Sequence, residues 1–267
     1  MTSRHLVLGL LVSISTASAQ DDPQVKQRLE LMQAAVDSLE AKSLELKPKT
    51  ALTMASKPLL RYSDPTPRLV CLDAGVWRLG AEGRPTALVT LELYQAPDGS
   101  RLLSFEFLSL TEKKFSLKHK TEDVRWDATA SGLDLKELPD APKPAAMAAA
   151  RLTQMRQLAR RFVAKERYNK EFTESRLIAQ PIDRYQSEAE KIVDGAIFAF
   201  ANGTNPEIGI VLEASGERWR YGTLRFCSAE ATVTLDGKEV AAYERFDARG
   251  RRDGPYNTGS YKIELGK

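Results

Sequence analysis

The chain has 267 residues, of which 42% are hydrophobic and 28% are charged, and its formal net charge is +3. This composition is typical of a soluble globular protein and argues against a disordered chain or a membrane-embedded one. The charge is too balanced to indicate nucleic-acid binding, and the sequence has no motif of a nucleic-acid-binding module.

The first nineteen residues have the three parts of a secretory signal peptide. Arg4 and His5 form a short positive region, residues 6–14 are apolar, and Ala17-Ser18-Ala19 is a small-x-small cleavage site. The apolar run has about half of the roughly 20 residues that a membrane-spanning helix needs. We therefore expect residues 1–19 to be removed, no integral membrane segment after cleavage, and a periplasmic or secreted protein.

The remaining sequence contains an internal repeat. Matches keep their order over about 100 residues, with apolar residues replacing one another between the identities. An offset of 123 aligns Arg28 with Arg151, Arg61 with Arg184 and Tyr62 with Tyr185, and an offset of 121 aligns Asp73 with Asp194, Pro85 with Pro206 and Glu92 with Glu213. We therefore predict a tandem duplication, with units at 20–137 and 145–267 and a Pro-rich linker at 138–144.

Each unit is predicted to begin with a long amphipathic helix. In the first unit apolar residues recur at helical spacing at Val25, Leu29, Met32, Val36, Leu39 and Leu46. In the second, within about residues 145–176, the same spacing is found at Leu152, Met155, Ala159 and Phe162. This pattern suits helices that each cover their own sheet, and also suits two helices packed against each other.

Short strands separated by turn signals follow each predicted helix. The first unit has them at 75–79, 87–94, 101–110 and 115–118, and the second at 196–201, 208–214, 219–226 and 231–235, with a further candidate at 261–265. Strands joined by such short loops pair antiparallel. The predicted fold class is therefore α+β, in which each copy is a long amphipathic helix followed by an antiparallel sheet of four or five strands.

Most catalytic and cofactor chemistries lack the residues that they need. The predicted mature chain has one histidine, His119, which lies between two lysines that depress its basicity. No His/Cys cluster with zinc-ligand spacing and no glycine-rich phosphate loop is present, so we predict no metal and no cofactor. Cys71 and Cys227 suit either a disulfide in an oxidising compartment or two separate buried thiols.

The repeated polar residues are the candidate binding site. They are Arg61, Tyr62 and Asp73 with their counterparts Arg184, Tyr185 and Asp194. Arginine can hold a carboxylate or phosphate through two hydrogen bonds, and tyrosine offers a platform for a sugar or peptide. The alternative is an arginine–aspartate pair within each copy that fastens a loop to the sheet.

Carboxylates are the remaining catalytic candidates. If the two copies face each other, Asp73 and Asp194, or Glu92 and Glu213, would approach as a glycoside-cleaving pair does. The alternative is that the aspartates cap turns and the glutamates lie on solvated strand faces.

The second predicted helix is rich in arginine. Arg156, Arg160, Arg161 and Arg167 are candidates for contact with an anionic cell-wall polymer or membrane surface. The alternative is a solvated face, or pairing with acids elsewhere in the chain.

One segment resembles a motif of uncharacterised, signal-bearing bacterial proteins. It runs from Asp194 to Phe200 (DGAIFAF) and continues as Gly203-Thr204-Asn205-Pro206-Glu207 and Leu212-Glu213-Ala214, and residues 73–77 (DAGVW) are a degraded copy. The family has no assigned activity, so the resemblance implies only a bacterial, extracytoplasmic setting.

These observations favour a non-enzymatic envelope or secreted protein that binds a partner, either an anionic polymer or another protein. One alternative is a carboxylate-dependent hydrolase of extracellular polysaccharide, supported by the repeated acids. Another is a structural oligomer that forms through the amphipathic helices. The missing catalytic constellations make an enzyme the less favoured reading.

Overall fold

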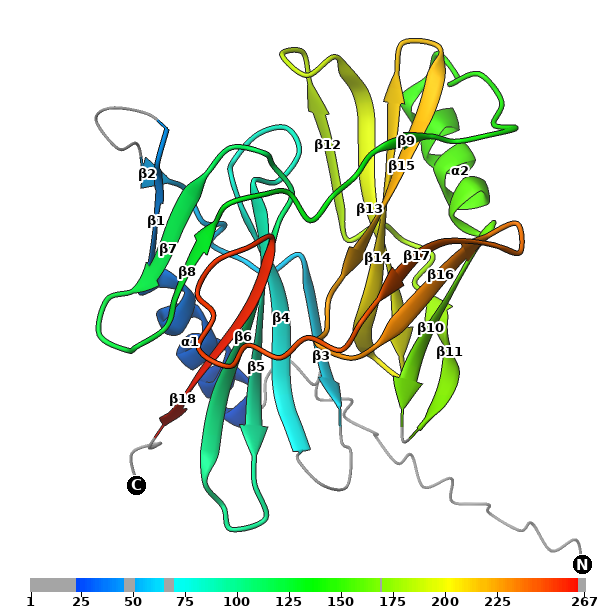
Figure 1. Ribbon diagram of the computed structural model, residues 1–267. Helices are drawn as coiled ribbons and strands as arrows, with labels where there is room; N and C mark the ends of the chain where they lie inside the picture. The colour runs from blue at the N-terminus through cyan, green and yellow to red at the C-terminus, as the bar shows by residue number, and fades with distance from the viewer. Residues whose placement is uncertain (1–22, 46–50, 65–69, 169, 264–267) are drawn as a thin grey trace, which may run out of the picture.

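The computed structural model describes residues 23–45, 51–64, 70–168 and 170–263 (Figure 1). The predicted signal peptide and Leu46 lie outside the described residues. Within the described ranges the chain forms two helices and eighteen strands. No helix in these ranges is long and apolar enough to cross a membrane.

The elements fall into two halves. The first half consists of α1 (Pro23–Asp37), β1 (Leu39–Ser43), β2 (Ala51–Leu52), β3 (Leu60–Asp64), β4 (Val70–Leu79), β5 (Ala87–Gln95), β6 (Arg101–Ser109), β7 (Phe115–His119) and β8 (Arg125–Ala128). After β9 (Lys136–Glu137), the second half consists of α2 (Ala148–Ala159), β10 (Phe162–Tyr168), β11 (Glu171–Leu177), β12 (Asp183–Ser187), β13 (Ile192–Asn202), β14 (Asn205–Ser215), β15 (Arg218–Arg225), β16 (Ala231–Leu235) and β17 (Lys238–Tyr243). The last strand is β18 (Tyr256–Ile263).

The α+β fold class that we predicted is wrong, because the protein is mostly β. The helices have only 15 and 12 residues, and a strand begins within three residues of each helix end. Leu39 and Phe162, which extended the predicted helical stripes, are the first residues of β1 and β10. In β1 burial alternates along Leu39, Ala41 and Ser43, as expected for a strand with one buried face.

The strands pair in the same order in the two halves. The order β2-β1-β7-β8 has its counterpart in β11-β10-β16-β17, and β3-β4-β5-β6 in β12-β13-β14-β15. The registers also agree: Ala74 pairs with Glu92 as Gly195 pairs with Glu213, at an offset of 121 on both strands. In the second half β11 also pairs with β13, which joins the two sets into one curled sheet.

Edge strands are exchanged between the halves. The C-terminal strand β18 pairs with β6 of the first half, and β9, which precedes α2, pairs with β15 of the second half. The large sheet of the first half therefore includes a strand from the C-terminal end of the chain, and that of the second half includes a strand that precedes α2 in sequence.

The core has three layers. Met32 and Val36 of α1 pack on Trp77 and other residues of the outer face of the first sheet. Similarly, Met155 and Leu158 of α2 pack on the second sheet, around Phe198, Ile210 and Leu212. Each helix therefore covers its own sheet and does not pack against the other helix.

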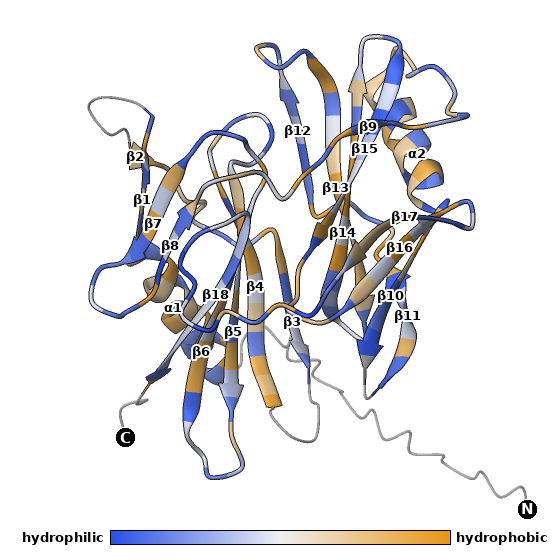
Figure 2. Ribbon diagram, in the orientation of Figure 1, coloured by the Kyte–Doolittle hydropathy of each residue, from blue (hydrophilic) through white to orange (hydrophobic). Residues whose placement is uncertain are grey.

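The inner faces of the two sheets pack against each other. We call this layer, between β3–β6 and β12–β15, the interlayer; its core includes Val76, Leu88, Ile197, Val211 and Leu224. Hydrophobic residues run along the central strands on either side of it (Figure 2). Each large side chain fully buried in such a layer contributes about 1.5–3 kcal/mol to stability, so the interlayer holds the halves together.

Candidate functional site

The repeated arginines and aspartates form ion pairs under the helices, in which the carboxylates are buried and the arginines are partly exposed. In the first half Arg61 Nε donates to Asp73 Oδ1 at 2.8 Å, and Arg28 of α1 donates to Asp73 Oδ2 at 3.4 Å. Arg61 also donates to the carbonyl of Val25 in α1 at 3.2 Å. The carboxylate of Asp73 is only 5% exposed. Arg28 fastens α1 to the sheet through this carboxylate, and Arg61 does so through the carbonyl of Val25.

The second half repeats this arrangement. Arg184 Nε donates to Asp194 Oδ1 at 2.8 Å, and Arg151 of α2 donates to Asp194 Oδ2 at 2.9 Å. Arg184 also donates to the carbonyl of Ala148 at 2.6 Å. This is the arrangement that the ion-pair alternative described. It leaves neither aspartate free to act as an acid or to hold a ligand.

Asp73 and Asp194 do not come together. Each faces the helix of its own half, and the interlayer lies between the two sheets. They therefore cannot form the glycoside-cleaving pair that we considered.

The two repeated tyrosines point the other way, into the interlayer. Tyr62 Oη donates to Glu92 Oε1 at 3.0 Å, and Tyr185 Oη donates to Glu213 Oε1 at 2.8 Å. Gly195 makes room for this: a Cβ there would lie 2.3 Å from a ring carbon of Tyr185. The interlayer therefore contains two buried tyrosine–glutamate pairs, one from each half.

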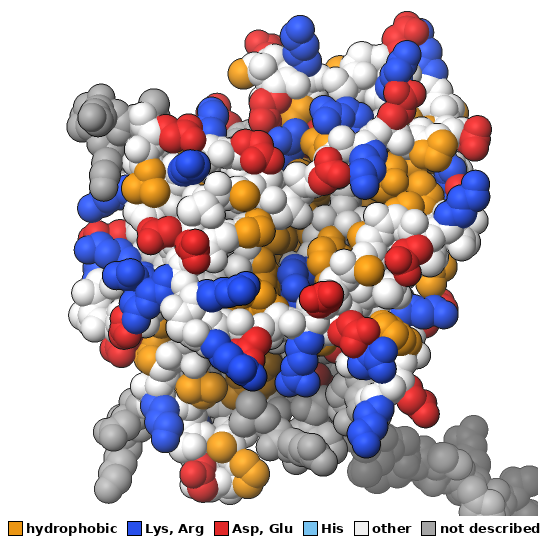
Figure 3. Space-filling model, viewed as in Figure 1, with side chains coloured by type: hydrophobic (Ala, Val, Ile, Leu, Met, Phe, Trp, Pro, Cys, Tyr) orange, Lys and Arg blue, Asp and Glu red, His pale blue; other side chains and the backbone are white. Residues whose placement is uncertain are grey.

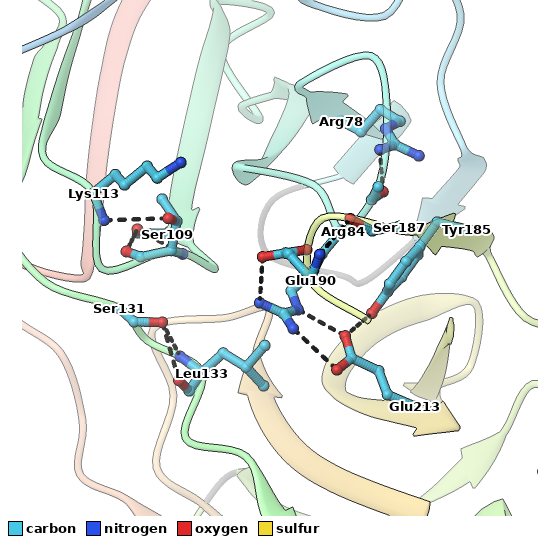
Figure 4. A network of polar contacts seen from close by, with 12 residues as sticks. Arg78, Arg84, Ser109, Lys113, Ser131, Leu133, Tyr185, Ser187, Glu190 and Glu213 are labelled. Carbon is cyan, nitrogen blue, oxygen red and sulfur yellow. Dashed lines mark hydrogen bonds and ion pairs between the residues drawn. The ribbon is translucent and has the colours of Figure 1, made fainter. Parts of the chain in front are cut away.

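Glu213 is neutralised by an arginine from the first half. Arg84, in the connection between β4 and β5, donates to Glu213 Oε1 at 2.7 Å and to Oε2 at 3.0 Å, and also reaches Glu190 (Figure 4). Close by, Arg78 pairs with Asp183 at 2.8 Å. We call this region the Arg84 end; it borders a pocket of about 610 Å³.

The opposite end of the interlayer holds an excess of negative charge. Here a pocket of about 460 Å³ is lined by Asp64, Glu92, Glu106, Glu166 and Glu207. No lysine or arginine is among the described residues that line it. We call it the acidic pocket.

Burial and mutual repulsion raise the pKa values of these acids. Burial, followed by the charge of Glu166, raises the pKa of Glu207 to about 8. Burial, followed by the charge of Glu92, holds the pKa of Glu106 well above its usual range. For Glu92 burial raises the pKa, and hydrogen bonds from Tyr94 and Tyr62 partly offset it. The pocket therefore favours protons or other cations.

Three groups in the acidic pocket have the spacing and types of metal ligands. One carboxylate oxygen each from Glu166 and Glu207 and the Sγ atom of Cys227 all lie within 4.8 Å of one another. Both cysteines are free thiols, so the disulfide alternative does not apply.

Sequence reasoning missed this group. Glu207 was singled out only within the bacterial motif, and Cys227 only as a thiol that either forms a disulfide or is buried separately. The three residues are far apart in sequence, and a search for closely spaced histidines and cysteines does not find them. The one available signal was the repeat itself, because acids stand where the first half has Ser43 and Thr86.

The predicted basic surface is divided among several elements. Arg156 lies on α2 and hydrogen-bonds Gln180, and Arg160 is the C-terminal cap residue of that helix. Arg161 follows the helix and forms an ion pair with Asp236. Arg167 lies on β10, 2.6 Å from Glu230 and above the ring of Phe172. Positive and negative side chains are interspersed over the face shown in Figure 3. Arg161 and Arg167 thus pair with nearby acids, and the four arginines lie on different elements rather than on one cationic helix face.

Comparison of the chain with protein-family models, curated proteins and solved structures found no match.

Proposed function

We propose that this protein is an extracytoplasmic binding protein whose ligand carries positive charge and occupies the acidic pocket. The observation that carries the proposal is the group of five carboxylates lining one pocket with no lysine or arginine among its described lining residues. The extracytoplasmic setting is inferred from the signal-peptide pattern at residues 1–19.

Buried carboxylates without a cationic partner are costly, and a bound cation offsets that cost. Removing charged groups from water costs several kcal/mol per ion unless an opposite charge lies close by. At the Arg84 end the protein supplies that charge itself. A cationic ligand would do the same in the acidic pocket.

The ligand class therefore differs from the anionic polymer that the arginine-rich run suggested. Arg156, Arg161 and Arg167 already have local partners. The acidic pocket instead gathers five carboxyl groups with no lysine or arginine among its described lining residues, which favours a cationic ligand.

A second candidate function is carboxylate-dependent hydrolysis, and one observation favours it. Glu207 has a pKa of about 8, so its carboxyl group carries a proton at neutral pH and has the character of a general acid. Glu166 and Glu92 would then be candidates for the second carboxylate. Hydrolysis of an extracellular polysaccharide that Glu207→Gln abolishes would support this function.

The binding proposal is tested with terbium(III), a hard cation that binds carboxylates and whose luminescence rises when protein ligands replace its water. Purified protein should show saturable binding. The double variant Glu92→Gln/Glu106→Gln should weaken binding by at least about tenfold, or roughly 1.4 kcal/mol.

Glu190→Gln is the matched control, because Glu190 is 46% exposed and belongs to the Arg84 end. It should leave terbium binding unchanged. Absence of saturable binding, or an equal loss in the control variant, would show that the acidic pocket is not the binding site.

A further inference from the structure

The three metal-ligand types in the acidic pocket come from separate segments that converge. Glu166 lies on β10, Glu207 on β14, and Cys227 in the segment after β15. Their ligand atoms lie within 4.8 Å of one another. A tetrahedral zinc ion with bonds of about 2.0–2.3 Å holds its ligand atoms roughly 3.5 Å apart, so small side-chain rotations would close the group around an ion.

Glu166 supplies an independent sign of a missing partner. The residue is only 7% exposed, and its Oε2 atom is buried without a hydrogen-bond partner among the described residues. Buried carboxylate oxygens are rarely left unsatisfied, because the loss of hydration costs free energy. This oxygen belongs to a residue that lines the acidic pocket beside Glu207 and Cys227.

The segment that carries Cys227 is held in place by hydrogen bonds. The backbone N–H of Phe226 donates to the carbonyl of Glu207 at 2.8 Å. Arg225 donates to the carbonyls of Cys227 at 2.9 Å and Ala229 at 3.1 Å. These contacts fix the thiol relative to β14 before any ligand arrives.

The same framework occurs in the first half without the ligating groups. Ser43 pairs with Phe115 as Glu166 pairs with Ala231. Leu110 donates to the carbonyl of Thr86 as Phe226 donates to that of Glu207. The positions of Glu166, Glu207 and Cys227 thus correspond to those of Ser43, Thr86 and Thr111. Glutamate and cysteine are not required by the fold there, which indicates a role in binding.

We propose that Glu166, Glu207 and Cys227 form a site for a divalent metal of the zinc class within the acidic pocket. This inference rests on the proposed function and names its ligand. A thiolate disfavours calcium and magnesium, which take oxygen ligands, and suits zinc, cobalt(II) or cadmium. Three protein ligands leave a fourth position for water or a further ligand from the pocket.

Binding displaces two protons, one from the thiol of Cys227 and one from Glu207, whose pKa of about 8 keeps it protonated at neutral pH. The ion bonds to the sulfur of Cys227 as the thiol proton leaves to solvent, and no electron transfer is involved. The carboxylates of Glu166 and Glu207 supply two further negative charges. The side chain of Asn202 interacts with Glu166 and favours its charged form, and so helps to orient it.

The test is titration of the purified protein with cadmium(II) and cobalt(II), followed by ultraviolet and visible absorption. A thiolate-to-metal charge-transfer band should appear and saturate at one metal per chain. Cys227→Ser should abolish the band, and Glu166→Gln should weaken metal binding by at least about tenfold. Cys71→Ser is the matched control, because Cys71 is the only other cysteine, and it should keep the band.

The outcomes separate this inference from the proposed function. Saturable terbium binding without a charge-transfer band would overturn the thiolate metal site and leave the cationic pocket standing. Absence of both signals would overturn both. A band that is lost in Cys71→Ser and kept in Cys227→Ser would also overturn the site.

A measurement on the unaltered chain guards against variants that fail to fold. Zinc should slow alkylation of Cys227 by a thiol reagent by at least about tenfold, read by mass spectrometry, and a chelator should restore the rate. Equal rates with and without zinc would overturn the inference.

Discussion

The two ends of the interlayer use corresponding positions but treat charge differently. Glu213 and Glu92 occupy equivalent registers, and each accepts a hydrogen bond from a repeated tyrosine. At the Arg84 end, Arg84 neutralises Glu213 through two hydrogen bonds. In the acidic pocket the position equivalent to Arg84 is Asn205, one residue before the repeated proline.

The same asymmetry extends to a second pair. Arg78 and Asp183 form an ion pair near the Arg84 end. Their equivalents in the other half are Ala199 and Leu60, which carry no charge. One framework thus accommodates both a neutralised end and an acidic one, so the negative charge of the acidic pocket is not a requirement of the fold.

The largest effect on stability is expected from removing the arginine that neutralises Glu213 at the Arg84 end. Arg84→Met leaves the carboxylate of Glu213 buried without its cation, since that side chain is only 1% exposed. Loss of one partner of a buried ion pair costs about 3–5 kcal/mol. Urea unfolding should show this loss, whereas Glu82→Gln, an exposed change in the same loop, should change stability little. A loss below about 1 kcal/mol for Arg84→Met would show that the pair is not essential to this end.

The acidic pocket should make the free energy of unfolding depend on pH. Burial raises the pKa of Glu207 to about 8 in the folded chain, whereas glutamate in an unfolded chain has a pKa of about 4.3. The folded state therefore holds its proton more tightly, and the resulting stability is present below the unfolded pKa and lost as pH rises toward about 8.

Urea unfolding of chelator-treated protein between about pH 5 and about pH 8 measures this loss. Glu207→Gln, which cannot ionise, should flatten the decline. A slope that is unchanged in Glu207→Gln would assign the dependence to other groups.

The acidic pocket can be given an arginine at the position equivalent to Arg84. Asn205→Arg should place a guanidinium near Glu92 and stabilise the chelator-treated protein by about 1–2 kcal/mol, as expected for hydrogen bonds to a charged group. It should also weaken terbium binding by about tenfold. Asn205→Gln, which adds length without charge, should do neither, and a similar effect of both changes would argue against electrostatic neutralisation.

The smallest effect on stability is expected from removing one hydroxyl group, that of Tyr94. Tyr94 Oη donates to Glu92 Oε2 at 2.8 Å, and this contact has no counterpart at the Arg84 end, where Ser215 occupies the equivalent position. Tyr94→Phe should cost about 1 kcal/mol, measured by urea unfolding. Tyr261→Phe, on β18 outside the pocket, is the control, and an equal cost there would remove the assignment to Glu92.

The hairpin strands were predictable because their signals are local. The segments 87–94 and 208–214 lie within β5 and β14, and 231–235 coincides with β16. Turn residues and β-branched runs specify such strands without reference to the rest of the chain. The helix lengths were not predictable, because Leu39 and Phe162 satisfy a helical spacing and a strand alternation equally well over a short window.

By itself the sequence determined the offsets of 123 and 121 that relate the registers of the two halves, and the repeated polar residues that they align. Only the tertiary structure decided that Arg61 and Arg184 face the helices, and that the glutamates of β5 and β14 face the interlayer. The acidic pocket exists only because these strands turn their acidic side chains toward the interlayer. Its acids lie on β3, β5, β6, β10 and β14, and they acquire raised pKa values only when two sheets exclude water from between them.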